Sequence, residues 1–135
     1  MKADVGKALQ KLLKKSKDLK HLNLEYNELM VQGTKSISLG VMKSNSLEIL
    51  NIKGNVIGDQ GMILLAQSLR QAQNLKEIDV SLNEIGPTGF QELCNVLPFT
   101  NIKTLICNKN FLGDEILSLF AQVISGENGT PACKL

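Results

Sequence analysis

Apolar and polar positions alternate in one pattern that recurs four times along the chain. Each copy reads apolar-x-x-apolar-x-apolar-x-x-Asn-x-apolar, and the copies begin at residues 19, 47, 75 and 102. The short alternation inside the motif is typical of a half-buried β-strand. A fixed internal period of this length indicates a repeat architecture. The asparagines that mark the register, with spacings of 28, 28 and 27 residues, are Asn27, Asn55, Asn83 and Asn110.

A second pattern begins six residues after each asparagine. Apolar or small residues stand at its start and at offsets of one, four, five and eight residues, which is the spacing of an amphipathic helix. Residues 3–16 fit the same template, with Leu9 and Leu13 at two of these offsets. The third repeat is one residue short near Pro98, where we expect its helix to end early. The repeated unit is therefore predicted to be a strand followed by a helix.

One strand–helix unit cannot bury its apolar stripe alone, so the units are expected to stack side by side. This predicts an α/β solenoid, a right-handed arc with a parallel sheet on the concave face and helices on the convex face. Residues 1–127 are predicted to form one domain, and residues 128–135 a tail that cloning could have added. The strand residues expected to point between sheet and helices are Leu22, Leu24, Leu50, Ile52, Ile78, Val80, Leu105 and Cys107.

The four asparagines are expected to be structural. Each lies where the chain leaves a strand, and its amide can both donate to and accept from backbone groups that lack a sheet partner. Such amides would form a ladder from repeat to repeat. Three residues beyond, Gly58, Gly86 and Gly113 are expected to allow a tight turn, and the first repeat has Met30 at that place.

With these motifs the chain resembles leucine-rich repeat proteins, and the 28-residue period is similar to the ribonuclease-inhibitor-like subfamily. That subfamily includes Ran GTPase-activating proteins and the sensor domains of NOD-like receptors. The resemblance covers about residues 5–125 and implies a module that binds a protein partner, as a fragment or a short array. It also implies an alternative, regulation of a small GTPase, but the loop arginine of those activators has no counterpart here, because the only arginine is Arg70.

Partner binding is expected on the concave face, where repeat proteins present outward-facing strand residues. Tyr26 and Ile49 are candidate anchors there, together with Leu82 and Ile106, because apolar and aromatic groups dominate interface energies. The residues predicted to face a partner are His21, Asn23, Glu25, Tyr26, Ile49, Asn51, Lys53, Glu77, Asp79, Ser81, Thr104, Ile106 and Asn108.

Composition argues against catalysis and metal binding. The chain has a single histidine, His21, and its three cysteines form no metal-binding pair. We therefore predict no catalytic residues, no metal and no cofactor. The net charge of +2 divides into +5 for residues 1–20 and −3 for the remainder. The lysine-rich opening could suit anionic lipid or nucleic acid, but it lacks aromatic residues for base stacking, so neither membrane nor nucleic-acid binding is predicted.

A cytoplasmic location is expected, because no apolar run of membrane-spanning length occurs and the first residues lack the apolar core of a signal peptide. Cys133-Lys134-Leu135 resembles a peroxisomal targeting tripeptide, with a cloning tail as the competing explanation. An assembly role is the third functional hypothesis. Phe111, Leu112 and Phe120 are expected to leave an uncapped edge through which the last repeat could self-associate.

Overall fold

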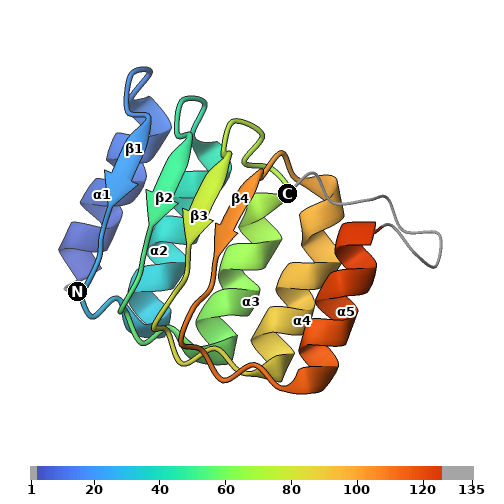
Figure 1. The fold of residues 1–135 in the computed structure, drawn as a ribbon. Helices are drawn as coiled ribbons and strands as arrows, with labels where there is room; N and C mark the ends of the chain where they lie inside the picture. The colour runs from blue at the N-terminus through green and yellow to red at the C-terminus, as the bar shows by residue number, and fades with distance from the viewer. Residues whose placement is uncertain (1–2, 126–135) are drawn as a thin grey trace.

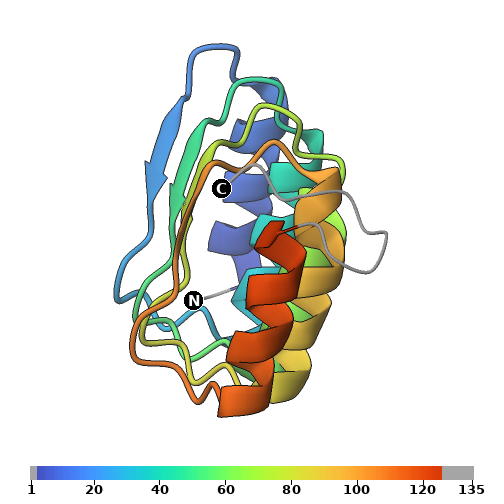
Figure 2. The ribbon, with the colours of Figure 1, turned by 45° about the vertical axis from the view of Figure 1, so that its right-hand side comes forward.

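Strands and helices alternate along the chain and form two layers. The computed structural model describes residues 3–125, and its strands lie in one sheet with the helices packed behind it (Figures 1 and 2). The elements are α1 (Ala3–Lys15), β1 (His21–Asn23), α2 (Met30–Lys43), β2 (Ile49–Asn51), α3 (Gly58–Leu69), β3 (Glu77–Asp79), α4 (Pro87–Val96), η1 (Leu97–Phe99), β4 (Thr104–Ile106) and α5 (Asp114–Ser125).

The sheet is parallel, with the strand order β1-β2-β3-β4. Equivalent motif positions stand opposite one another, so that His21, Ile49, Glu77 and Thr104 form one row across the four strands. Each crossover between parallel strands passes through a helix, as such connections require. The predicted α/β solenoid with a parallel sheet is therefore confirmed.

The core lies between the sheet and the helices. Leu50, Ile52, Ile78 and Val80, on or directly after the two central strands, are 0% exposed. Their counterparts in the first and last repeats are only partly buried against the same core, because β1 and β4 are the edge strands of the sheet within the described residues. These counterparts are Leu22, Leu24, Leu105 and Cys107.

The apolar faces of the helices are buried in α2, α3 and α4 but partly exposed in α5. Leu117 and Ile124 on α5 are 52% and 40% exposed, because no further helix among the described residues packs beyond them. The shortened third repeat has the shortest of these helices: α4 has 10 residues against 12 in α3. Pro98 lies in the 3₁₀ turn η1 that comes next, as expected of a residue that cannot continue a helix.

Tight turns recur where the strands end. At the motif position before each asparagine, Tyr26, Gly54, Leu82 and Lys109 all have φ between 54° and 69°. Gly58 also has a positive φ of 60°, and Met30 adopts 52° at the matching place without the freedom of glycine. The prediction of the same backbone role for Gly86 and Gly113 is wrong, since the φ of Gly86 is −94° and that of Gly113 is not positive either.

Candidate functional site on the concave face

The predicted partner-facing residues line the open side of the sheet, and they differ in exposure. Tyr26 is 63% exposed, and His21, Asn23, Thr104 and Asn108 are exposed as well. The others, except Ser81, are half-buried: Glu25, Ile49, Asn51, Lys53, Glu77, Asp79 and Ile106.

Ser81 departs from the prediction, because it is only 3% exposed. Its Oγ accepts a hydrogen bond from the backbone N–H of Asn108 at 3.0 Å, so the hydroxyl links the third repeat to the fourth. Ser81 therefore links two repeats and contributes little exposed surface to the concave face.

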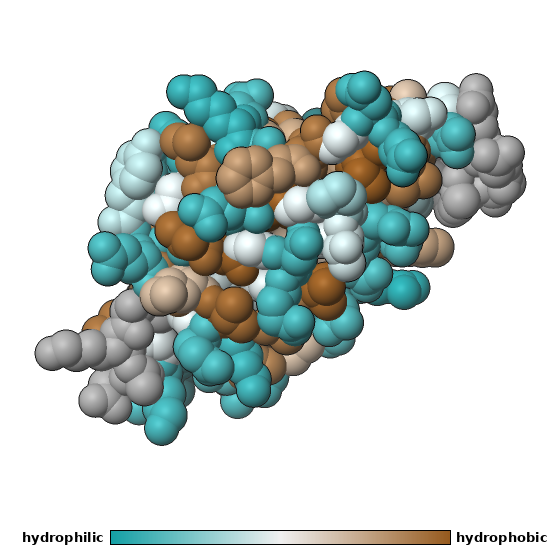
Figure 3. Space-filling view, turned by 90° about the horizontal axis from the view of Figure 1, so that it is seen from below, coloured by the Kyte–Doolittle hydropathy of each residue, from teal (hydrophilic) through white to brown (hydrophobic). Residues whose placement is uncertain are grey.

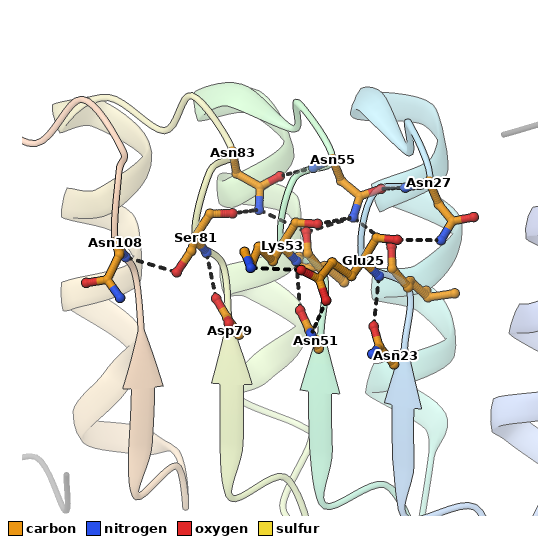
Figure 4. Close-up of polar contacts among 12 residues, drawn as sticks. Asn23, Glu25, Asn27, Asn51, Lys53, Asn55, Asp79, Ser81, Asn83 and Asn108 are labelled. Carbon is orange, nitrogen blue, oxygen red and sulfur yellow. Dashed lines mark hydrogen bonds and ion pairs between the residues drawn. The ribbon is translucent and has the colours of Figure 1, made fainter.

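Polar side chains at the strand ends hold their own turns. Asn23, Asn51 and Asp79 each accept a hydrogen bond at 2.9–3.0 Å from the backbone N–H two residues later (Figure 4). Such short-range bonds keep the side chain in one orientation. The polar surface at this end of the sheet is therefore already organised before anything binds.

An ion pair connects the first two repeats on this face. Lys53 Nζ lies 2.8 Å from Glu25 Oε1 (Figure 4), and it also lies 5.6 Å from the centre of the Tyr26 ring. The hydrogen bond to Glu25, together with its negative charge, raises the pKa of Lys53 above its ordinary value. The Lys53 ammonium group therefore already has an intramolecular partner. It also forms a cation–π contact with the Tyr26 ring.

A shallow hollow of about 290 Å³ lies across the centre of the sheet. Glu77 and Asp79 on β3 both line it, with Ile49 beside Glu77 and Ile106 beside Asp79 in the strand register. Within residues 3–125, neither carboxylate forms an ion pair, and Glu77 has no hydrogen-bond partner either. The centre of the concave face therefore combines two carboxylates that form no ion pair with two isoleucine side chains, and the Asp79 charge also acts on Lys53.

The motif asparagines hold the turns behind this surface. Asn55 Oδ1 accepts hydrogen bonds from the backbone N–H groups of Asn27 and Leu29 in the preceding repeat, at 3.0 and 3.1 Å. Its Nδ2 donates to the carbonyls of Leu24 and Ile52, both at 2.8 Å. Figure 4 shows the side chains succeeding one another from repeat to repeat. They do not face the hollow, which agrees with a structural role.

Asp59 is a structural residue that the sequence patterns did not reveal. Its Oδ1, on α3, accepts hydrogen bonds from the backbone N–H groups of Gly86 and Gly89 at 2.8 Å each. Asp59 therefore caps the first turn of α4, the next helix along. A β-carbon at Gly89 would lie 2.7 Å from that oxygen and 2.9 Å from the Asp59 backbone, so this glycine provides close approach. The sequence signal is only an acidic residue one repeat before a Gly-x-x-Gly spacing.

Metal binding and membrane crossing have no structural basis in the part of the chain that the structure describes. There, no group of three or more His, Cys, Asp or Glu side chains could hold a metal ion. Over the same residues, no helix has both the length and the apolar character needed to cross a membrane. Tail residues 128–135, including Cys133-Lys134-Leu135, lie outside the described range.

Comparisons with known proteins agree with this architecture. A family model described as Leucine Rich repeat matches residues 43–66 and 71–94. The solved structure of leiomodin-1 Actin-Binding Site 2 is similar with a TM-score of 0.77 and 11% identity, over 85% of this chain and 69% of that one. The tropomodulin C-terminal domain of Caenorhabditis elegans is similar with a TM-score of 0.64 and 12% identity, over 90% of each chain. No curated protein sequence matches the chain. The fold, with two of its repeats matched by the family model, is therefore that of a leucine-rich repeat solenoid.

Proposed function

We propose that this chain is a non-enzymatic protein-interaction module that binds its partner on the concave sheet surface. The 28-residue period and the full helices of 12 and 14 residues in α3 and α2 favour the ribonuclease-inhibitor-like subfamily. Leucine-rich repeat domains typically bind proteins, and the sheet face carries organised side chains that no helix covers (Figure 2).

The observation that carries the proposal is the central hollow. Carboxylates without an ion-pair partner, flanked by isoleucines, complement a segment that presents Arg or Lys beside an aliphatic side chain. A partner would supply the counter-charge to Glu77 and Asp79 and bury Ile49 and Ile106. Apolar contact gives most of the affinity in such an interface, while the charges give specificity and a faster association rate.

The other functional classes have less support. Arg70 comes directly after α3 on the convex side, where its guanidinium lies 4.7 Å from the Phe99 ring centre, so no observation favours a GTPase-activating arginine on the concave face. Actin binding is named for the leiomodin-1 structure, and at 11% identity the likeness shows the fold alone. We therefore define the partner by its chemistry.

The test is selection from a random peptide library against the purified chain. We expect enriched peptides with a basic residue next to an aliphatic one, and a rise in Kd of about tenfold or more for the Glu77→Gln, Asp79→Asn double variant. Glu84→Gln, an exposed residue in the loop after β3, is the matched control and should bind as the wild type does. Peptides without that pattern, or equal binding to the double variant, would reject the central hollow as the binding site.

Self-association is a second candidate function, and the last repeat favours it. Phe111 is 68% exposed and Leu117 is 52% exposed, both at the end where no further repeat packs within the described residues. Exposed clusters of this kind mark interaction surfaces in soluble proteins. We infer that a second copy can cover this end, which leaves the concave face free for its partner.

A further inference from the structure

A second hollow lies on the opposite side of the molecule, between α2 and α3. It has a volume of about 260 Å³, and we call it the α2–α3 groove. Leu39, Met42 and Leu64 supply its apolar lining, while Lys35 and Gln71 supply polar groups. Its size is near the lower end of the roughly 300–1,000 Å³ range of small-molecule sites, and its mostly apolar lining with a few polar groups is typical of them.

A buried hydroxyl without a partner lines this groove. Ser38 is 5% exposed, and its Oγ has no hydrogen-bond partner within residues 3–125. A buried polar group that forms no hydrogen bond carries a desolvation cost that a bound donor or acceptor would remove. At the same helix position, the next two repeats have Ala66 and Cys94, so the hydroxyl is specific to this groove.

The neighbouring repeat indicates what kind of group fits. A shift of 28 residues takes Met42 to Arg70 and Gln71 to Phe99. There the Arg70 guanidinium stacks on the Phe99 ring at 4.7 Å. The chain therefore places an aromatic ring of its own at the equivalent position between α3 and α4, whereas between α2 and α3 the matching residue is a glutamine.

We propose that the α2–α3 groove binds a free, compact aromatic compound that carries a hydroxyl group. The ring takes the position that Phe99 occupies one repeat later and contacts Met42 and Leu64. The hydroxyl pairs with Ser38 Oγ once rotation about χ1 turns that oxygen into the groove, because it has almost no accessible surface in the structure. This site is independent of the concave face and of any protein partner bound there.

The experiment is a titration of the isotope-labelled chain, monitored by backbone amide NMR shifts, with 4-methylphenol as the probe. We expect shift changes concentrated in α2 and α3. Gln71→Phe should abolish them, because a ring at position 71 would occupy space in the groove that this residue lines. Gln91→Phe introduces the same side chain on the exposed face of α4 and should leave binding unchanged.

Two further arms test the hydroxyl and the source of the ring. Ser38→Ala should weaken 4-methylphenol by roughly two- to tenfold and leave toluene, which lacks the hydroxyl, unchanged. N-acetyltyrosinamide should bind no more tightly than 4-methylphenol. Tighter binding of N-acetyltyrosinamide would reject the proposal that the ligand is a free compound and would indicate a tyrosine side chain of another protein. Shifts that are absent, that spread over the whole chain, or that persist in Gln71→Phe would overturn the site itself.

Discussion

The side-chain amide of Asn83 makes four backbone contacts while fully buried. Its Oδ1 accepts from the N–H of Asn55 at 2.9 Å, and its Nδ2 donates to the carbonyls of Ile52, Val80 and Ser81 at 2.9–3.0 Å. No apolar residue can replace both halves of that pattern. Removing the amide would leave buried backbone groups in two repeats without partners, and each such group is costly.

Replacing Asn83 with Ala should lower the free energy of unfolding by about 1–3 kcal/mol, measured by urea denaturation. Asn27→Ala is the matched control. Asn27 is exposed, and its side chain donates only to the carbonyl of Glu25, so a loss within about 0.5 kcal/mol is expected. Equal losses for the two variants would contradict the ladder as a source of stability.

The role of a single residue can be predicted from the sequence when a local, repeated pattern determines that role. The ladder asparagines repeat every 27 or 28 residues beside a strand, and their chemistry leaves few other roles. The burial of Ser81 is not visible in the pattern, because the same motif position holds the half-buried or exposed Glu25, Lys53 and Asn108, and only the short serine side chain accepts a hydrogen bond from the next repeat. Asp59 was missed because its partners, Gly86 and Gly89, lie 27 and 30 residues away, and because the matching positions of the first and third repeats hold Val31 and Pro87.

At the scale of the elements, hydrogen bonds as well as apolar packing connect α3 to α4. The Asp59 carboxylate accepts two N–H groups that the first turn of α4 would otherwise leave without partners. A negative charge there also interacts favourably with the helix dipole. No residue within α4 provides a side-chain cap of its own, so the start of this helix depends on its neighbour.

Asp59→Ala should therefore destabilise the chain by about 1 kcal/mol, within the usual range of roughly 0.5–2 kcal/mol for a lost cap, as measured by thermal or urea unfolding. Asp59→Asn keeps an oxygen acceptor and should lose less. Gln60→Ala changes the adjacent exposed residue and serves as the control. If Gln60→Ala costs as much as Asp59→Ala, the capping role is refuted.

The order of the strands and helices can be predicted from the repeat pattern. The confirmed fold shows that the pattern is sufficient to predict which segments are strands and which are helices. The exposure of α5 cannot be predicted from it. Leu117 and Ile124 stand at the same stripe positions as residues that are buried in α2, α3 and α4. Whether a stripe is covered depends on the next helix, which is a property of the stack and not of the stripe.

For the whole molecule, charge and apolar surface are distributed unevenly. The first 20 residues carry the excess of lysine, while large exposed apolar side chains occur at both ends of the stack, Val5 and Leu12 in α1 and Phe111, Leu117 and Ile124 in the last repeat. On the face at which the strands end and the helices begin, hydrophilic side chains surround separate apolar patches (Figure 3). The two ends of the stack therefore differ in charge, and so in the surfaces of other molecules that they can contact favourably.

We expect the purified chain to show a concentration-dependent mass in size-exclusion chromatography with light scattering. Phe111→Ser with Leu117→Ser should shift it to monomer, because both side chains are exposed at the last repeat and contribute apolar area to the contact. Val5→Ser with Leu12→Ser removes similar exposed area from α1 and should leave the association unchanged. A chain that is monomeric at every concentration would reject self-association.

The asparagine ladder also has a direction. Each amide oxygen secures backbone N–H groups of the repeat before it: Asn110 secures Asn83 and Ile85, and Asn55 secures Asn27 and Leu29. When the last repeat frays, the turn before it loses its acceptor. Fraying of the first repeat takes only the Leu24 carbonyl from the ladder, and Asn55 Nδ2 keeps the carbonyls of Ile52 and Lys53 as acceptors. Local opening should therefore travel from the carboxyl end toward the amino end, one repeat at a time, and amide hydrogen exchange should be fastest where the ladder begins to fail.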